Sequence, residues 1–285
     1  MSSKRRMEAC SSSKTRDAGL IEAYAGIDVA FAKKKKLPVV VAMKRGAILE
    51  PLELRRASSV PPAGEGNARI LDAKTVTHFA HLTSEYLQNI EKEFTVRICR
   101  VAIDAPSNPL QDGKRRRHCE IGLDARRISC IATPSSGKFK KIVNRGLNHL
   151  HNGGATSRLP GANQLWMLVG FALFEGLRQR WECIEVFPQA IAVVLNAHKI
   201  PKNQEEGLRA QLEAVSQRTN WPSNPEPGAL VPIAYGAPHD KLDAYLAAWV
   251  ASLDEEEREP IGLPPDDAIW VPRNPPRTIS LTASP

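Results

Sequence analysis

The chain has 285 residues, of which 42% are hydrophobic and 25% charged, as is typical of folded proteins rather than disordered ones. A formal net charge of +8 favours a polyanionic partner. The five scattered cysteines form no Cys-x-x-Cys pair, so neither a zinc site nor a disulfide framework is indicated, and the apolar runs are too short to cross a membrane.

The N-terminal residues 1–20 are basic and serine-rich, and we expect them to form a flexible tail. They lack the apolar stretch of a secretion signal. Unpaired cysteines also suit a reducing compartment. We therefore expect a cytoplasmic protein with no membrane partner.

Three strand-like runs follow the tail, at residues 24–30, 37–43 and 47–54. The turns between them are short, which predicts an antiparallel meander. Residues 75–93 carry apolar side chains at helical spacing and predict a helix. Residues 97–104 predict a fourth strand, which ends at an Asp-Ala-Pro turn.

A basic insertion at residues 110–160 interrupts this regular pattern. Beyond it the sequence alternates again between helical and strand-like segments. We predict helices at 162–180, 189–196, 205–218 and from Asp240, and strands at 183–187 and 268–271.

Antiparallel strands followed by parallel crossovers predict an α/β fold, with a mixed five-stranded sheet and helices on its faces. We expect one domain over residues 21–272, with residues 110–160 inserted in it and a proline-rich tail at 273–285.

Acidic residues stand where these elements end or begin. Asp28 ends the run AYAGID, Asp104 ends VRICRVAID, and Glu185 lies in WECIEVFP. A carboxylate at the end of a buried strand is costly unless it is paired, hydrogen-bonded or bound to a cation. Asp240 and Asp243 open an apolar helix and share one of its faces. Converging in space, these five acids would form a site for Mg²⁺ or Mn²⁺.

Each acid also has a structural interpretation when taken alone. Asp104 precedes Ala-Pro and would cap the following turn. Asp240 would cap its helix, and Asp243 would compensate the helix dipole. It is the ordered set of five that favours a metal site.

Basic residues early in the insertion are candidates for binding the phosphates of a nucleic acid. The alternative is a solvated basic face with no ligand. The candidates are Lys114, Arg115, Arg116, Arg117, Arg126 and Arg127.

The motifs GIDVA, AIDAPSNP with RRRHCEIGLDARR, EVFP, HDKLDAYLAAWVA and IWVP occur in this order over residues 24–272. In this the chain resembles a bacterial and archaeal family catalogued as a domain of unknown function and described as predicted nucleases of ribonuclease H fold. The resemblance implies a ribonuclease H-like fold. It makes Asp28, Asp104 and Glu185 the acids of the strand motifs, and Asp240 and Asp243 those of the last helix. His239 departs from the pattern, because many members carry an aspartate there.

We therefore expect a metal-dependent nuclease that hydrolyses phosphodiester bonds of DNA or RNA with two metal ions. In this hypothesis Asp28 bridges the ions, Asp104 and Glu185 bind one each, and Asp240 or Asp243 completes a site. A protein partner that switches the activity on is compatible with the sequence.

Two alternatives remain. One is a non-catalytic nucleic-acid-binding or scaffold module on the same fold. The other is a nucleotide- or ATP-handling enzyme, which is disfavoured because GIDVAFAKKKK lacks the Gly-Thr loop that would hold ATP phosphates.

Overall fold

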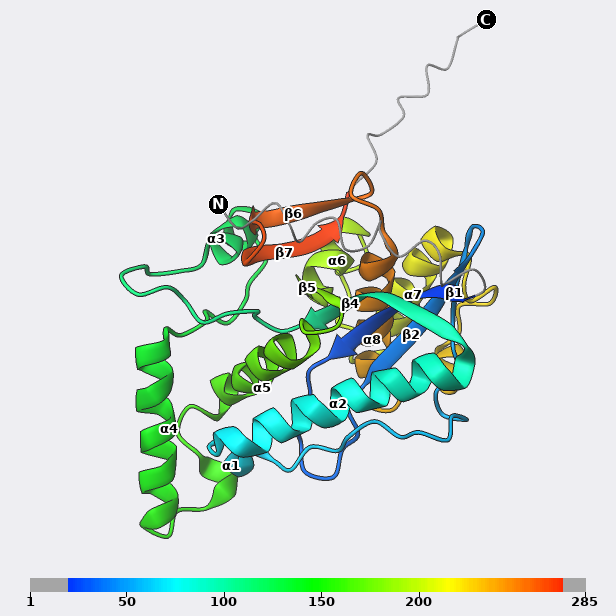
Figure 1. The fold of residues 1–285 in the computed structure, drawn as a ribbon. Helices are drawn as coiled ribbons and strands as arrows, with labels where there is room; N and C mark the ends of the chain where they lie inside the picture. Colours follow the sequence, from blue (N-terminus) through cyan, green and yellow to red (C-terminus); the bar gives the residue numbers. More distant parts are fainter. Residues whose placement is uncertain (1–19, 274–285) are drawn as a thin grey trace, which may run out of the picture.

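A computed structural model describes residues 20–273, so the two predicted tails lie almost entirely outside the described residues. Its centre is a mixed sheet of seven strands in the order β3-β2-β1-β4-β5-β7-β6 (Figure 1). The pairings β1-β4, β4-β5 and β5-β7 are parallel. The pairings β1-β2, β2-β3 and β6-β7 are antiparallel. The strands are β1 (Ile21–Asp28), β2 (Val39–Arg45), β3 (Ile48–Pro51), β4 (Val96–Asp104), β5 (Glu182–Val186), β6 (Arg258–Leu263) and β7 (Asp267–Pro272).

The predicted mixed α/β fold is confirmed, but the predicted number of five strands is wrong. The segment predicted as a short final strand is β7, which joins the same sheet beside β5. Strand β6 was not predicted because Pro260 and Gly262 interrupt its apolar pattern. A proline is tolerated there because β6 is the edge strand of the sheet.

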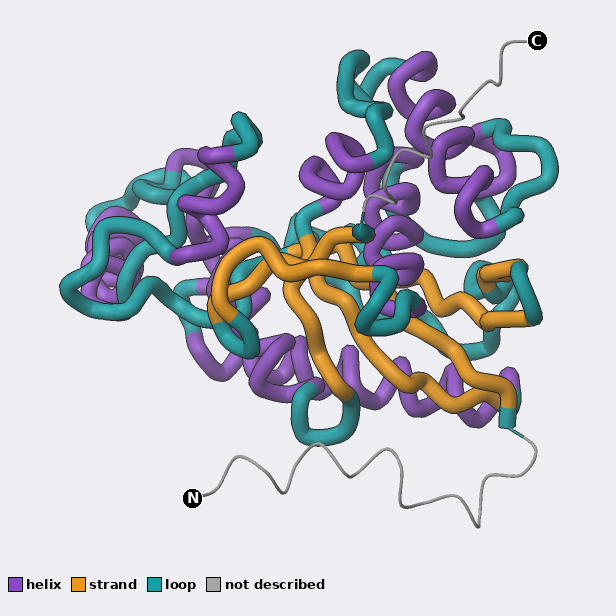
Figure 2. Tube along the Cα trace, turned by 90° about the horizontal axis from the view of Figure 1, so that it is seen from above, coloured by secondary structure: helices purple, strands orange, loops and turns teal. Residues whose placement is uncertain are grey.

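Helices cover both faces of the sheet (Figures 1 and 2). On one side lie α1, α2 and α5, and on the other α6, α7 and α8, each side with its own apolar core. The helices are α1 (Asn67–Ile70), α2 (Ala73–Phe94), α3 (His118–Ala125), α4 (Ser136–His151), α5 (Ala162–Leu177), α6 (Pro188–Val194), α7 (Glu205–Thr219) and α8 (Pro238–Ser252), with short 3-10 turns η1 (Thr156–Arg158) and η2 (Pro227–Leu230). No helix between residues 20 and 273 is both long enough and apolar enough to cross a membrane.

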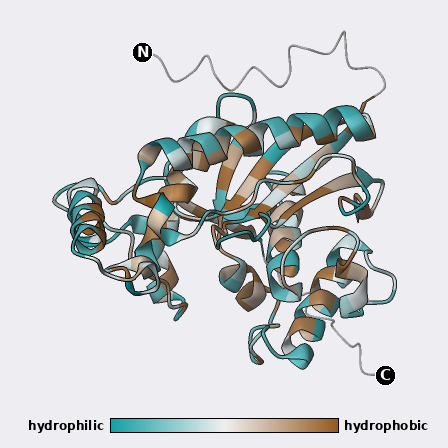
Figure 3. Ribbon diagram, turned by 90° about the horizontal axis from the view of Figure 1, so that it is seen from below, coloured by the Kyte–Doolittle hydropathy of each residue, from teal (hydrophilic) through white to brown (hydrophobic). Residues whose placement is uncertain are grey.

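Alternation along β1 divides its side chains between the two cores. Ala23, Ala25 and Ile27 face the α2/α5 side, and Tyr24 faces the α8 side. Figure 3 shows the resulting pattern, with hydrophobic residues along the strands and hydrophilic ones on the outer surface of the helices. The alternation also assigns Gly26 and Asp28 to the side of α8.

Helix α8 approaches β1 closely at Gly26. A Cβ atom on this residue would lie 2.0 Å from the Ala244 carbonyl oxygen and 2.3 Å from the Ala248 amide nitrogen. All residues of α8 from Lys241 to Ser252 are buried, as expected for a helix enclosed on every side. The contact holds Asp243, the neighbour of Ala244, beside the end of β1.

The pairing of β1 with β4 contains one irregularity. Ala23 pairs with Ile98 but Tyr24 pairs with Arg100, so β4 holds one residue more than β1 at this point. Beyond this bulge the register is regular and pairs Asp28 with Asp104. Opposed residues of neighbouring strands point to the same face, so both carboxylates lie on the α8 side.

The basic insertion consists of two parts that attach at different places. Helix α3 packs against β6 and β7 at one edge of the sheet. Helix α4 packs on α5 through an edge-to-face contact between Phe139 and Phe171, whose ring centroids lie 5.4 Å apart. Figures 1 and 2 both place α4 at the side of the molecule away from α7.

We expect Gly26→Ala to lower the free energy of unfolding by about 3 kcal/mol. The added methyl group would overlap backbone atoms of α8, which cannot move aside as a flexible side chain can. Urea denaturation measures the loss. The control is Gly137→Ala in α4, where an added Cβ meets nothing. A Gly26→Ala variant as stable as this control would contradict the packing described here.

Candidate metal centre

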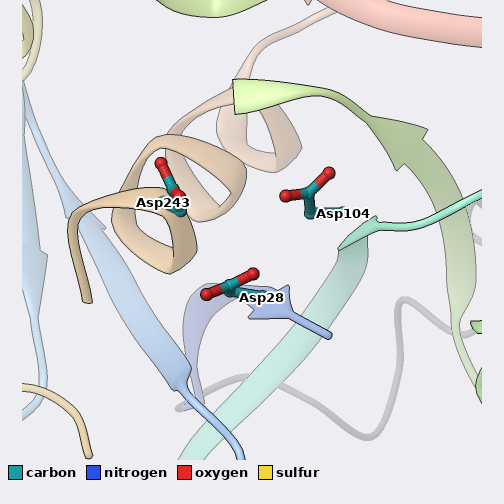
Figure 4. A group of neighbouring side chains, drawn as sticks. All are labelled: Asp28, Asp104 and Asp243. Carbon is teal, nitrogen blue, oxygen red and sulfur yellow. The ribbon is translucent and has the colours of Figure 1, made fainter. Parts of the chain in front are cut away.

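Three of the five predicted acids converge. One carboxylate oxygen from each of Asp28, Asp104 and Asp243 lies within 4.8 Å of the other two. We call these residues the acid triad. Figure 4 shows the three side chains as neighbours, at the end of β1, at the end of β4 and on helix α8. Asp243 is buried, and Asp28 and Asp104 are partly buried.

Burial and mutual repulsion disfavour the charged form of each acid. Burial, with added repulsion from Asp243, raises the pKa of Asp104 to about 8. Burial also raises the pKa of Asp28 well above its ordinary value, and repulsion from Asp104 and Asp243 adds to it. The pKa of Asp243 is raised by burial as well, although Lys202 opposes the shift. The triad therefore requires a positive charge to be fully ionised near neutral pH.

Lys202 supplies part of that charge. Its ammonium forms an ion pair with Asp243 Oδ2 and favours the ionised form of all three acids. It lies in the loop between α6 and α7. Nothing in the sequence distinguishes it from the other loop lysines, so it was not predicted. One monovalent charge leaves three ionised carboxylates undercompensated.

The donor set fits a divalent cation. Asp243 Oδ1 is buried and has no hydrogen-bond partner among residues 20–273. Such an oxygen costs about 1–3 kcal/mol, or more when it is charged. Three carboxylates form an all-oxygen donor set, which Mg²⁺ and Mn²⁺ prefer. Asp28, Asp104 and Asp243 are therefore the residues that would hold the ion.

Glu185 lies outside the triad. Its two carboxylate oxygens accept hydrogen bonds from Arg117 at 2.8 and 2.6 Å, and the two side chains are each 4% exposed. The amide of Ser107 donates a further bond at 2.8 Å. Burial raises the pKa of Glu185, and Arg117 and Ser107 oppose that shift. Glu185 is thus neutralised within the protein.

This ion pair supports the loop that follows Asp104. Ser107 belongs to that loop, and Arg117 is the residue before α3. Arg117 Nε also lies 3.4 Å from Asp267 Oδ1. Asp267 in turn accepts bonds from the amides of His118 and Cys119 at 2.8 and 3.2 Å, which caps α3. Glu185 therefore ties the end of β4 to the insertion and to β7.

Asp240 has the capping role that the sequence left open. Its Oδ2 accepts a bond of 2.9 Å from the amide of Ala237, at the start of α8. Its Oδ1 lies 3.2 Å from His239 Nε2. The carboxylate is still close enough to raise the pKa of Asp28 and Asp243, after burial and nearer groups. Asp240 adds negative charge beside the triad.

The six candidate basic residues do not form one surface. Arg117 is buried against Glu185. Arg116 is paired with Glu120 and Asp124, Arg126 with Glu259, and Lys114 Nζ lies 2.8 Å from His118 Nε2. Arg115 and Arg127 are exposed. Intramolecular partners therefore occupy most of this set.

We expect the affinity for Mn²⁺ to rise by at least about tenfold per pH unit below about pH 8 and less steeply above it, because a bound ion displaces at least one proton held at the triad. Isothermal titration across this range measures the affinity. Repeating the titration in buffers of different ionisation enthalpy gives the number of protons released per bound ion.

Lys202→Gln provides the matched comparison. Loss of the ammonium leaves the carboxyl pKa values still higher, so the rise in affinity should move to higher pH. An affinity that does not vary with pH would show that the ion does not compete with protons at these acids.

We expect Arg117→Met to lower the free energy of unfolding by about 3–5 kcal/mol, because it leaves the Glu185 carboxylate buried without its partner. The double variant Arg117→Met/Glu185→Gln should regain part of that loss in chemical denaturation. Glu185→Gln alone should bind Mn²⁺ as the wild type does. A large loss of Mn²⁺ affinity in this folded variant would assign Glu185 to the metal centre after all.

Comparisons with known proteins give one finding. A family model described as "Protein of unknown function (DUF429)" matches residues 26–267. Curated proteins and solved structures give no match. The matched region contains all three triad residues and covers most of the chain. The protein therefore belongs to the DUF429 family.

Proposed function

We propose that this protein is a metal-dependent nuclease that hydrolyses phosphodiester bonds of DNA or RNA. The observation that carries the proposal is the acid triad, with its undercompensated charge and the unpartnered Oδ1 of Asp243. Five neighbouring strands, β3-β2-β1-β4-β5, with the first three antiparallel and the next two parallel to β1, support the ribonuclease H-like core that the motifs imply.

Mg²⁺ or Mn²⁺ bound at the triad would stabilise the charge that develops on the phosphoryl oxygens and activate the attacking water. In the hydrolysis, the water oxygen forms a bond to phosphorus while the ester oxygen leaves. The water gives up a proton and the leaving oxygen takes one. Asp28 and Asp104, the less buried members, would lie on the side of the substrate. Asp243 would hold the ion from the buried side, and all three carboxylates would serve as its ligands.

A second candidate function is a nucleic-acid-binding module without catalysis. The ion pair between Lys202 and Asp243 favours it, because a fixed ammonium would occupy part of the place of a cation. In that case millimolar Mn²⁺ would not bind. Binding of Mn²⁺ that is lost in Asp243→Asn would favour the nuclease.

We expect wild-type protein to cleave a panel of labelled DNA and RNA substrates only when Mg²⁺ or Mn²⁺ is present. Asp28→Asn, Asp104→Asn and Asp243→Asn should each lower the rate by at least about 100-fold, since even residues that only support metal ligands cost 10–100-fold. Gel electrophoresis of the products measures the rate and identifies the substrate class.

The control for this assay is Glu256→Gln, which removes an exposed carboxylate and should cleave like the wild type. Cleavage that survives in all three triad variants would come from another site or a contaminant. Failure of the wild type to bind Mn²⁺ and to cleave any substrate would contradict the proposal.

A further inference from the structure

A cavity of about 650 Å³ lies among α4, α5 and residues 110–134. Its lining contains four cationic side chains and no acidic one. The cations are Arg115, Lys138, Lys141 and Arg145, and we call this cavity the basic groove. The side-chain amides of Asn144 and Asn148 line it as well.

Helix α4 arranges most of this lining along one line. Lys138, Lys141, Arg145 and Asn148 are spaced by three or four residues, so they form one exposed stripe along the helix. The stripe is about 15 Å long at the helical rise per residue. The adjoining face, with Phe139, Ile142 and Gly146, is buried. The cations therefore lie on a helix that the core holds in place.

The four cations stand apart from the ion pairs within residues 20–273. None of them forms an ion pair with any residue of the part of the chain that the structure describes. This sets them apart from Arg116, Arg117 and Arg126, which are each paired with a carboxylate. Like charges at these spacings on a helix repel one another. A polyanion in the groove would remove that cost.

The groove also lies close to the triad along the chain. Leu110, which lines the groove, pairs with Ser135 and is six residues beyond Asp104. Six residues reach at most about 22 Å. At about 3.4 Å per nucleotide pair, that distance corresponds to about six base pairs of a bound nucleic acid.

We propose that the basic groove binds the phosphate backbone of the nucleic-acid substrate, several nucleotides from the acid triad. The inference rests on the proposed function for the identity of the polyanion. A line of cations suits a chain of phosphates better than a single anion. The lining has no aromatic side chain on which a base would stack, so contacts to the backbone carry the binding.

The test measures binding without cleavage. Fluorescence anisotropy in EDTA follows labelled strands and duplexes of about 30 and about six nucleotides, at salt concentrations from about 50 to about 300 mM. The variant is Lys141→Gln/Arg145→Gln. The control is Lys92→Gln/Arg218→Gln, which removes one lysine and one arginine from exposed positions on α2 and α7.

We expect the groove variant to bind the long probe at least about tenfold more weakly, and the slope of log affinity against log salt to fall by about two, one for each lost phosphate contact. The short probe should also bind more weakly to the groove variant, because the stripe of about 15 Å contacts it directly. The control variant should bind like the wild type. Mn²⁺ titration should give the same affinity for both variants.

Equal binding of the long probe by the groove variant and the control would overturn the inference. So would displacement of the probe by inorganic phosphate at constant ionic strength, since this indicates a site for a single anion. The proposed function fails separately, through loss of Mn²⁺ binding and cleavage in a protein that still binds nucleic acid through the groove.

Discussion

The close contact of α8 with β1 is the constraint on which the candidate site depends. The backbone of the helix lies where the side chain of residue 26 would otherwise project, so only glycine fits there. That contact fixes the depth at which α8 crosses the sheet, and hence the position of Asp243 relative to the strand ends. Repulsion among the three acids acts in the opposite direction. Apolar packing of α8, whose residues Lys241–Ser252 are all buried, holds the carboxylates together against it.

The ends of β1, β4 and β5 accommodate a buried carboxylate in two different ways. Glu185 at the end of β5 is neutralised by Arg117 and an amide, and this pairing satisfies both of its oxygens. Asp28 and Asp104 have only the distant help of Lys202, and the third member keeps an oxygen without a partner. An ion pair whose hydrogen bonds are all formed within the protein has a structural role. A cluster of carboxylates that lacks such partners can accept a ligand. The difference separates the supporting residue from the candidate ligands.

The sequence was sufficient to predict that Asp28 and Asp104 lie close together, because both end apolar strands and parallel neighbours place such ends at one edge. It was not sufficient to separate Glu185 from them, because the partner that neutralises Glu185 is Arg117. Arg117 is distant in the chain, and the run of basic residues around it is typical of a surface. No sequence pattern indicated that Lys202 pairs with Asp243. Strand β6 was missed because edge strands tolerate prolines that obscure the pattern. The stripe on α4 shows its helical spacing in the sequence, but only the structure shows that its cations form no ion pair with another residue between 20 and 273.

The extra residue of β4 opposite Ala23 and Tyr24 has a consequence for how this architecture tolerates change in length. Turns and loops at the surface generally tolerate gained or lost residues better than the elements that they connect. Between the bulge and the two strand ends this freedom disappears. A single insertion there would turn one of the two aspartates to the opposite face of the sheet. Evolution can therefore lengthen this protein at its surface. In the segments from Tyr24 to Asp28 and from Arg100 to Asp104, however, the numbers of residues must stay equal.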